Sequence, residues 1–141
     1  MKEENYKQAV AYLKKASSIN SNSANLFSML ANAYFQNKEV NKALKALDDA
    51  EKIDPENLLV KYQKANILYL LKNYDDSLKI LNYLKDKIPK EAAIFILIGH
   101  NFKAKDDQKS ALFHYNKAID LDNKDYNSAK AAIEKLMMDN N

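Results

Sequence analysis

Residues 27–55, FSMLANAYFQNKEVNKALKALDDAEKIDP, decide the fold, because their pattern returns along the chain at a fixed interval. The closing word IDPEN, at 53–57, is followed by KIPKE at 87–91 and by LDNKD at 121–125, and each copy starts 34 residues after the one before. Repetition with such a period is typical of a solenoid, in which one small structural unit is stacked several times. We therefore expect the chain to be an array of repeats.

Columns of small and large apolar residues keep the same period. One set recurs over four copies and consists of Ala9, Ala43, Ser77 and Ala111, of Leu13, Leu47, Leu81 and Tyr115, and of Ala16, Ala50, Leu84 and Ala118. A second set recurs over three copies and consists of Leu30, Lys64 and Ile98, of Ala31, Ala65 and Gly99, and of Tyr34, Leu68 and Phe102. Spacings of three, four and seven are helical, and small residues recur where two helices approach closely. Each repeat is thus predicted to be a pair of helices.

The helices can be placed along the chain from these columns. They are predicted at about 3–19, 24–37, 40–53, 58–71, 74–87, 91–104, 107–120 and 126–138. Pro55 and Pro89 lack the N–H that a continuing helix needs, so each suits a junction between two hairpins. Because two Pro and one Gly in 141 residues leave little of the chain for strands, we expect an all-α fold.

This pattern resembles the tetratricopeptide repeat (TPR) family, whose period is 34 residues. The residues of the opening stretch that stand at the family's positions are Phe27, Leu30, Ala31, Tyr34, Ala43, Ala50 and Pro55. The resemblance implies a right-handed TPR superhelix, an α-solenoid of antiparallel helix pairs with about three and a half repeats and a capping helix. Within one domain, 1–141, the predicted parts are the second helix of an incomplete repeat at 3–20, repeats at 24–57, 58–91 and 92–125, and a capping helix at 126–138.

The chain departs from the family pattern at a few positions. Lys61 and Lys64 stand where apolar residues are usual, Ser77 replaces an Ala, and Asn123 replaces a Pro. These changes weaken the fit of single repeats and leave the assignment in place.

The two ends of the chain differ. Residues 3–19 match only the second helix of a repeat, so we expect this chain to be the C-terminal end of a longer TPR protein. The alternative is a short natural protein whose bare first helix finds a partner by self-association. In either case Tyr6, Val10 and Leu13 lack the preceding helix that would cover them, so we expect self-association through this end. At the other end, the closing helix is followed only by DNN.

Longer words narrow the resemblance. The stretches 42–68, 89–124 and 129–136, and above all IPKE, ILIGH and AIDLD, are similar to the last repeats of one TPR scaffold. That scaffold is the coactivator-binding subunit of the anaphase-promoting complex, a ubiquitin ligase of cell division found in nucleus and cytoplasm. The resemblance implies a non-catalytic protein–protein interaction scaffold that contacts other subunits of a large complex. It also implies dimerisation through upstream repeats and a groove for the Ile-Arg tail of coactivators.

Composition excludes several other functions. The absence of cysteine excludes disulfides and thiolate metal sites. The 22 basic residues are all Lys and are scattered among 19 acids, so the net charge of +3 attracts nucleic acid only weakly. The longest apolar run, AAIFILIG at 92–99, is far below the ~20 residues of a membrane helix. We therefore expect a soluble intracellular chain that binds neither nucleic acid nor a membrane.

No motif of the sequence indicates catalysis. His100 and His114 come without an HExxH motif or a Ser/His/Asp set, and one Gly cannot build a phosphate-binding loop. The acidic pairs are interpreted as caps and solvated helix features, and they are Asp48/Asp49, Asp75/Asp76 and Asp106/Asp107. We expect no enzyme activity, no cofactor and no metal site.

The candidate binding site follows from the resemblance, because the first helices of TPR pairs line the concave groove. The corresponding residues are Asn32, Phe35, Tyr62, Gln63, Asn66, Tyr69, Ile96 and His100. Amide side chains can hold an extended peptide backbone, since each is both donor and acceptor. The alternative is that Asn in this column is an ordinary feature of the repeat. The carboxylate clamp of chaperone-binding TPR domains is rejected, because only Asn32 fits it among Ser28, Asn32, Gln63, Ala93 and Leu97.

The ligand itself stays open at this point. An Ile-Arg tail needs an acid for its guanidinium, and only Glu56 and Glu91, at the starts of first helices, are near. We therefore expect weak binding of such a peptide. The apolar run AIFILIG indicates a helix covered on both faces or, alternatively, an apolar ligand pocket. An unrelated TPR adaptor for transport or assembly, or of co-chaperone type without the clamp, is the alternative function.

Overall fold

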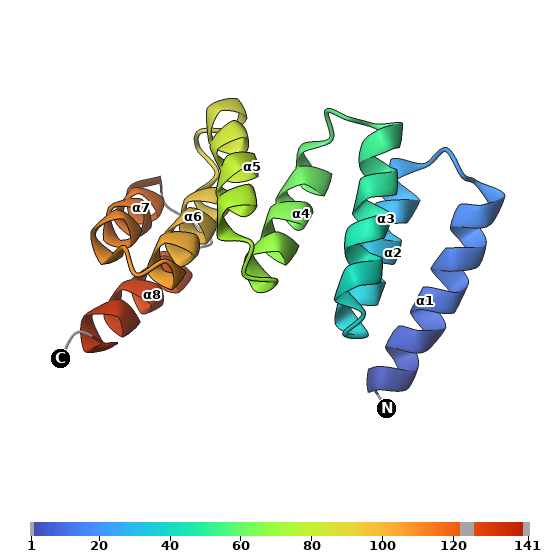
Figure 1. Ribbon diagram of the computed structural model, residues 1–141, viewed down its shortest axis with the longest axis horizontal. Helices are drawn as coiled ribbons and strands as arrows, with labels where there is room; N and C mark the ends of the chain where they lie inside the picture. Colours follow the sequence, from blue (N-terminus) through green and yellow to red (C-terminus); the bar gives the residue numbers. More distant parts are fainter. Residues whose placement is uncertain (1, 122–125, 140–141) are drawn as a thin grey trace. The chain divides into compact units, whose positions relative to one another are not determined.

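The computed structural model describes residues 2–121 and 126–139, and in these ranges it contains eight helices and no strand (Figure 1). They are α1 (Lys2–Ile19), α2 (Ala24–Gln36), α3 (Val40–Ile53), α4 (Leu58–Leu70), α5 (Tyr74–Lys87), α6 (Ala92–Ala104), α7 (Gln108–Leu121) and α8 (Tyr126–Asp139). Every predicted helix is present, with each end within one residue of its predicted place. The all-α prediction is confirmed. Residues 122–125 of the third junction, with Asn123, and the last two residues of DNN lie outside the described residues.

Contacts between the helices gather in two compact units, Met1–Ile67 and Leu68–Asn141, with the boundary inside α4. In the first unit α2 packs against α1 and α3, and in the second unit α6 packs against α5 and α7. Figure 1 shows α2 beside α3 and α6 beside α7 as antiparallel neighbours. The division of one domain into the proposed repeats, and the right-handed superhelix, stay predictions.

The repeating columns of the sequence form the core of each unit. In the first unit Ala43, Leu47 and Ala50 are fully buried. Val10 and Leu13 of α1 pack against this core. The corresponding buried residues of the second unit are Ser77, Leu81, Leu84, Ala111, Tyr115 and Ala118. Burial of one apolar face per helix is the main source of stability of such stacked pairs, as the column spacing predicts.

Val10 and Leu13 of α1 lack a preceding helix, but they are half-buried because the following hairpin packs against their face of α1. The exposed apolar side chains of α1 are instead Tyr12, which is 74% exposed, and Ile19, which is 78% exposed. Self-association through α1 stays a prediction.

One type of turn joins the two helices of each hairpin. Its central residue has a positive φ, which is 64° at Lys38, 65° at Lys72 and 63° at Asp106. In the first turn the N–H of Lys38 donates to the carbonyl of Phe35 over 3.0 Å, and the next N–H donates to the carbonyl of Tyr34 over 2.8 Å. The same two bonds recur at the other turns. This is a Schellman-type helix end, at which Gly is the usual residue.

The prolines lie in the junctions between hairpins, as predicted. Beside Pro55, the N–H of Asn57 donates to the carbonyl of Asp54 over 3.1 Å, and the Asn57 side chain accepts from the N–H of Val60 over 3.0 Å. The second bond caps α4. Asp107 likewise caps α7 by accepting from the N–H of Ser110 over 3.1 Å. Asp107 therefore has the capping role that was expected for the acidic pairs.

Polar partners explain three departures from the family pattern. The ammonium of Lys61 lies 3.3 Å from Glu51, and that of Lys64 lies 2.9 Å from Asp48. Partial burial opposes the charge of Lys64, but its acidic partners outweigh burial and raise its pKa. These ion pairs explain how two lysines are accommodated at positions where apolar residues are usual.

The third departure is Ser77, which lies in the core of the second unit. Its hydroxyl accepts from the amide of Asn101 over 3.1 Å, and both side chains are fully buried. A buried amide requires such a partner. The exchange of Ala for Ser in this column therefore follows from Asn101 on the facing helix.

A close contact between α6 and α7 sets the packing of the second unit. Tyr115 stands in the column where the other repeats have Leu, and its ring is fully buried. A Cβ added at Gly99 would lie 2.6 Å from Cδ1 of this ring. The other two repeats have Ala31 and Ala65 in the column of Gly99, so the smallest residue accompanies the largest partner.

We expect Gly99→Ala to destabilise the chain by about 1–3 kcal/mol, the usual cost of overpacking a core. The double substitution Gly99→Ala with Tyr115→Leu restores the Ala and Leu of the other repeats, so it is expected to cost less than the sum of the single changes. Urea denaturation of the four proteins measures this coupling. Additive effects would show that Gly99 is not required by the Tyr115 ring.

Lys72→Gly is expected to stabilise the chain by about 0.5–1 kcal/mol, because Gly adopts the positive φ of this turn without steric cost. Lys72 is exposed, so its side chain contributes little packing. Thermal and urea denaturation provide the measurement. The control Lys79→Gly, at an exposed position inside α5, is expected to destabilise by about 1 kcal/mol. A loss of stability in both variants would contradict the role assigned to the turn.

Candidate functional site

Four of the predicted groove residues meet in the first unit. Asn32 and Phe35 of α2 and Gln63 and Asn66 of α4 line one hollow of about 50 Å³, which has Ala31, Leu47 and Ile67 as its apolar walls. Asn32 is exposed, and the other three polar or aromatic side chains are half-buried. A space of this size takes one small group, such as a peptide carbonyl or a side-chain methyl.

A hydrogen bond from the preceding turn of α2 orients Gln63. The buried hydroxyl of Ser28 donates to Oε1 of Gln63 over 2.7 Å. The bond occupies the amide oxygen and leaves the NH2 group of Gln63 to donate to a ligand. Tyr62 lies about 100° around α4 from Gln63 and is half-buried. The structure therefore brings together two asparagines, one glutamine and one phenylalanine, with Tyr62 on a neighbouring face.

The remaining groove candidates belong to the second unit. The rings of Tyr69 and His100 stack with centroids 6.0 Å apart and an interplanar angle of 27°. A hydrogen bond of 2.7 Å joins Nδ1 of His100 to the hydroxyl of Tyr115. Ile96 is buried, as are all residues from Ile94 to Gly99, so α6 is covered on both faces as expected. A single groove over all eight candidate residues stays a prediction.

The aromatic cluster of the second unit is uncharged near pH 7. Burial, with a smaller effect of Lys103, lowers the pKa of His100 below its ordinary value. Burial also raises the pKa of Tyr115 and, with a smaller effect of Tyr74, that of Tyr69. These groups can stack and hydrogen-bond with a ligand, but they provide neither a charged partner nor a nucleophile.

The second histidine is held by packing within the same unit. His114 stacks on Phe102 at 5.4 Å and on Phe95 at 6.4 Å between ring centroids. Its Nδ1 lies 2.8 Å from the carbonyl oxygen of Ser110, which can only accept, so Nδ1 carries a proton. Burial, together with the nearby lysine charges, lowers the pKa of His114 despite this bond.

The residues that the structure describes contain no group of three His, Cys, Asp or Glu side chains able to hold a metal ion. Within the same described ranges no helix has both the length and the apolar character needed to cross a membrane.

The two histidines are expected to make stability depend on pH. In the unfolded chain they take up protons near their ordinary pKa of ~6.5, whereas their folded pKa values are lower, so protonation favours the unfolded state. The free energy of unfolding should therefore fall as the pH falls from about 7.5 to about 5.5. Urea denaturation across this range measures the slope. The double variant His100→Gln, His114→Gln is expected to give a flatter profile, and equal slopes would contradict the assignment.

The helix pairs, the repeated turn and the 34-residue columns define a tetratricopeptide repeat protein. A family model described as a tetratricopeptide repeat matches residues 92–125. A second model, described as "Anaphase-promoting complex, cyclosome, subunit 3", matches residues 2–83, more than half of the chain. The chain belongs to this family, whose members are non-catalytic TPR scaffolds. The resemblance noted in the sequence is confirmed, and the unrelated adaptor is set aside.

Curated relatives carry the same similarity over nearly the whole chain. "Anaphase-promoting complex subunit 3" of Schizosaccharomyces pombe is 35% identical over 129 residues, which are 92% of this chain and 19% of the relative. "Cell division cycle protein 27 homolog B" of Arabidopsis thaliana is 31% identical over 127 residues, 89% of this chain and 17% of the relative. The chain thus spans about a fifth of the length of these relatives.

Solved structures support the fold alone. A TPR protein named YrrB, described as having an unusual peptide-binding site, superposes with a TM-score of 0.83 at 24% identity, over 93% of this chain and 67% of that one. MamA from Desulfovibrio magneticus RS-1 gives a TM-score of 0.77 at 20% identity, over 94% of this chain and 84% of that one. Such a fold is compatible with many ligands, so the ligand has to be argued from the side chains.

Proposed function

We propose that this chain is a protein-binding segment of an anaphase-promoting complex subunit and that its first helices hold an extended peptide. Membership of the subunit 3 family supports the first part. The observation that carries the second part is the meeting of Asn32, Phe35, Gln63 and Asn66 around one hollow. In such a complex its partners are other subunits and coactivator tails, and its place is the nucleus or the cytoplasm.

The chemistry of the hollow suits a peptide backbone. Asn32 and Asn66 each offer one acceptor and two donors, and the Ser28 bond leaves the NH2 group of Gln63 to donate. An extended backbone presents N–H and C=O groups at short intervals, which amides can bind whatever the peptide side chains are. Phe35 adds an apolar contact beside these amides.

The charge of a tail ending in Ile-Arg is less well matched. The eight groove candidates include no carboxylate, and a desolvated guanidinium without an acid is costly. Glu56 and Glu91, the acids at the starts of two first helices, are exposed residues just before α4 and α6. We therefore propose that backbone contacts dominate and that an isolated Ile-Arg peptide binds this chain weakly.

Titration of the isotope-labelled chain with a peptide ending in Ile-Arg, followed by NMR, tests the proposal. We expect weak binding with shifts at the side-chain amides of Asn32, Gln63 and Asn66. Asn66→Ala should weaken binding about fivefold or more, the effect of one lost hydrogen bond, and Tyr62→Ala should weaken it as well.

Asn116→Ala provides the matched control, because Asn116 is an exposed amide on the second helix α7. This substitution is expected to leave the affinity unchanged. Shifts confined to second helices, or affinity that is insensitive to Asn66→Ala, would place the peptide elsewhere and contradict the proposal.

A further inference from the structure

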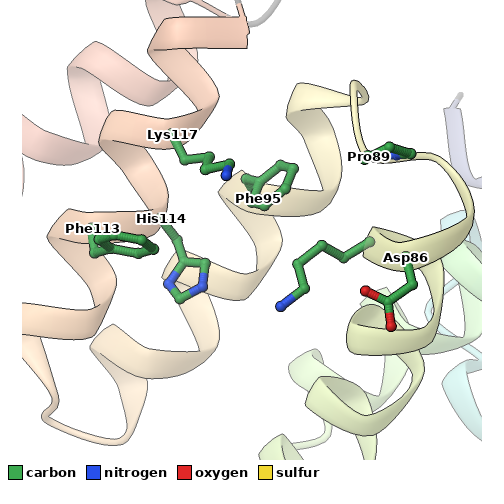
Figure 2. Close-up of a pocket in the computed structure, with 7 residues that line it drawn as sticks. Asp86, Pro89, Phe95, Phe113, His114 and Lys117 are labelled. Carbon is green, nitrogen blue, oxygen red and sulfur yellow. The ribbon is translucent and has the colours of Figure 1, made fainter.

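Another hollow lies in the second unit. It has a volume of about 480 Å³ and is lined by Lys85, Asp86, Pro89, Phe95, Phe113, His114 and Lys117. In Figure 2, Phe113, His114 and Lys117 extend from α7, Phe95 lies on α6, and Asp86 faces them from α5. We call this space the second-helix hollow. Its volume falls in the range of small-ligand pockets, roughly 300–1,000 Å³.

The second-helix hollow is separate from the groove of the proposed function. Ile96 and His100, the groove candidates on α6, are four residues apart and share a face of that helix. Phe95 lies about 100° around α6 from Ile96 and about 140° from His100. A ligand in this hollow would therefore contact a different side of α6.

Aromatic rings form the floor and one wall of the hollow. Phe95 is buried and supports the ring of His114, with centroids 6.4 Å apart. Phe113 meets the same imidazole edge-on at 5.1 Å, yet 64% of its surface is exposed. A large exposed apolar side chain beside a cavity favours contact with an apolar group of a ligand.

Two lysines give the hollow a positive charge. The ammonium of Lys117 lies 5.7 Å from the centroid of the Phe95 ring, and Lys85 lines the same space from α5. Within residues 2–121 and 126–139 neither ammonium is paired with a carboxylate. Asp86 is the one acid among the described residues of the lining, so these residues together favour an anion.

A similar hollow occurs in the first unit, at the corresponding positions of the repeat. A hollow of about 520 Å³ in the first unit has seven lining residues that stand two periods before those of the second-helix hollow. These seven are Ser17, Ser18, Ser21, Phe27, Lys45, Ala46 and Asp49. The aromatic floor, Phe27 and Phe95, is common to both. In the second unit, however, Lys85 stands in place of Ser17, and Lys117 in place of Asp49.

In the repeat between them, the corresponding floor position is Lys61, and its ammonium pairs with Glu51 at 3.3 Å. In this repeat Glu51 stands at the position of Lys85 and Lys61 at that of Phe95, so an ion pair replaces the aromatic floor. The hollow of the second unit differs from that of the first in its exposed Phe113, since Lys45 stands at that place in the first unit.

We propose that the second-helix hollow binds an acidic segment of a partner protein that carries one aromatic or aliphatic side chain between carboxylates. The carboxylates lie near the ammoniums of Lys85 and Lys117, and the apolar side chain covers Phe113. Lysines serve a carboxylate as point charges, and the chain has no Arg to form the two-bond fork that phosphate favours. The exposed Phe113 requires the apolar part of the ligand.

The test uses the whole 141-residue chain and the peptide acetyl-Ser-Glu-Asp-Phe-Asp-Glu-Ser-amide, followed by NMR of the two imidazole rings at pH 7.5. We expect saturable shifts of the His114 ring protons, while those of His100 stay in place. A peptide with Gln and Asn for the acids, and one with Ser for Phe, should each bind at least about fivefold more weakly.

Surface variants locate the site without threatening the fold. Lys85→Gln with Lys117→Gln should weaken binding about fivefold to tenfold, and Phe113→Ala by a similar factor. The matched controls are Lys79→Gln with Lys109→Gln, exposed positions on the same two helices, and Leu112→Ala, the neighbour of Phe113. These controls should change the affinity less than about twofold.

Three outcomes would overturn the proposal. One is equal affinity of the lysine double variant and its control. Another is equal binding of the acidic and amide peptides. The third is displacement of the peptide by a single-stranded oligonucleotide that itself shifts His114, because stacked bases would then be the ligand of Phe113. Failure of the Ile-Arg peptide to bind the first helices would leave this test unaffected, because the two sites differ in residues and in probe.

Discussion

The close approach of α6 and α7 at Gly99 is the constraint on which the candidate surfaces of the second unit depend. Only a residue without Cβ lets the Tyr115 ring lie flat against α6, because an added Cβ would meet three atoms of that ring within 3 Å. The ring then brings its hydroxyl to His100, 2.7 Å from Nδ1. One small residue thus positions the groove candidate that directly follows it in α6.

The same contact orients the other side of α7. With Tyr115 turned toward α6, helical geometry directs His114 and Lys117, three residues apart, to a common neighbouring face. His114 is held there by stacking on Phe95 and Phe102 and by its bond to the Ser110 carbonyl. The second-helix hollow and the cluster of Tyr69, His100 and Tyr115 therefore both draw residues from α6 and α7, although they share no lining residue.

The sequence predicted the helices well because their information is local and repeated. Each column recurs in three or four repeats, so the helix ends could be predicted to within one residue. The left-handed turns at Lys38, Lys72 and Asp106 were not predicted, since none of these residues is the Gly that normally marks such a turn. Their shared 34-residue spacing with two fixed hydrogen bonds becomes apparent only from the backbone.

The sites were less predictable, because they depend on side chains that are distant in the sequence. The Ser28 to Gln63 bond joins residues 35 positions apart, and Ile96, named as a groove residue, is buried by the covering of α6. The second-helix hollow draws its lining from three helices and one junction. The only signal in the sequence was Phe27 and Phe95 standing two periods apart, and that spacing equally fits a column of the core.

Stacked repeats separate the determinants of fold from those of binding. Chains with 24% and 20% identity to this one keep the fold at TM-scores of 0.83 and 0.77, so the fold tolerates exchange of most residues. Most residues that line the hollows lie outside the columns of small and large residues, and the lining varies between repeats of this one chain. In the repeat between Phe27 and Phe95 the corresponding position carries Lys61, which pairs with Glu51, in place of the aromatic residue. Because each repeat is stabilised by its neighbours, such exchanges cost the fold little, and a ligand can be selected by one repeat without rebuilding the others. The proposed specificity is therefore a property of single repeats, and the exposed Phe113, in place of Lys45, distinguishes the hollow of the second unit from that of the first.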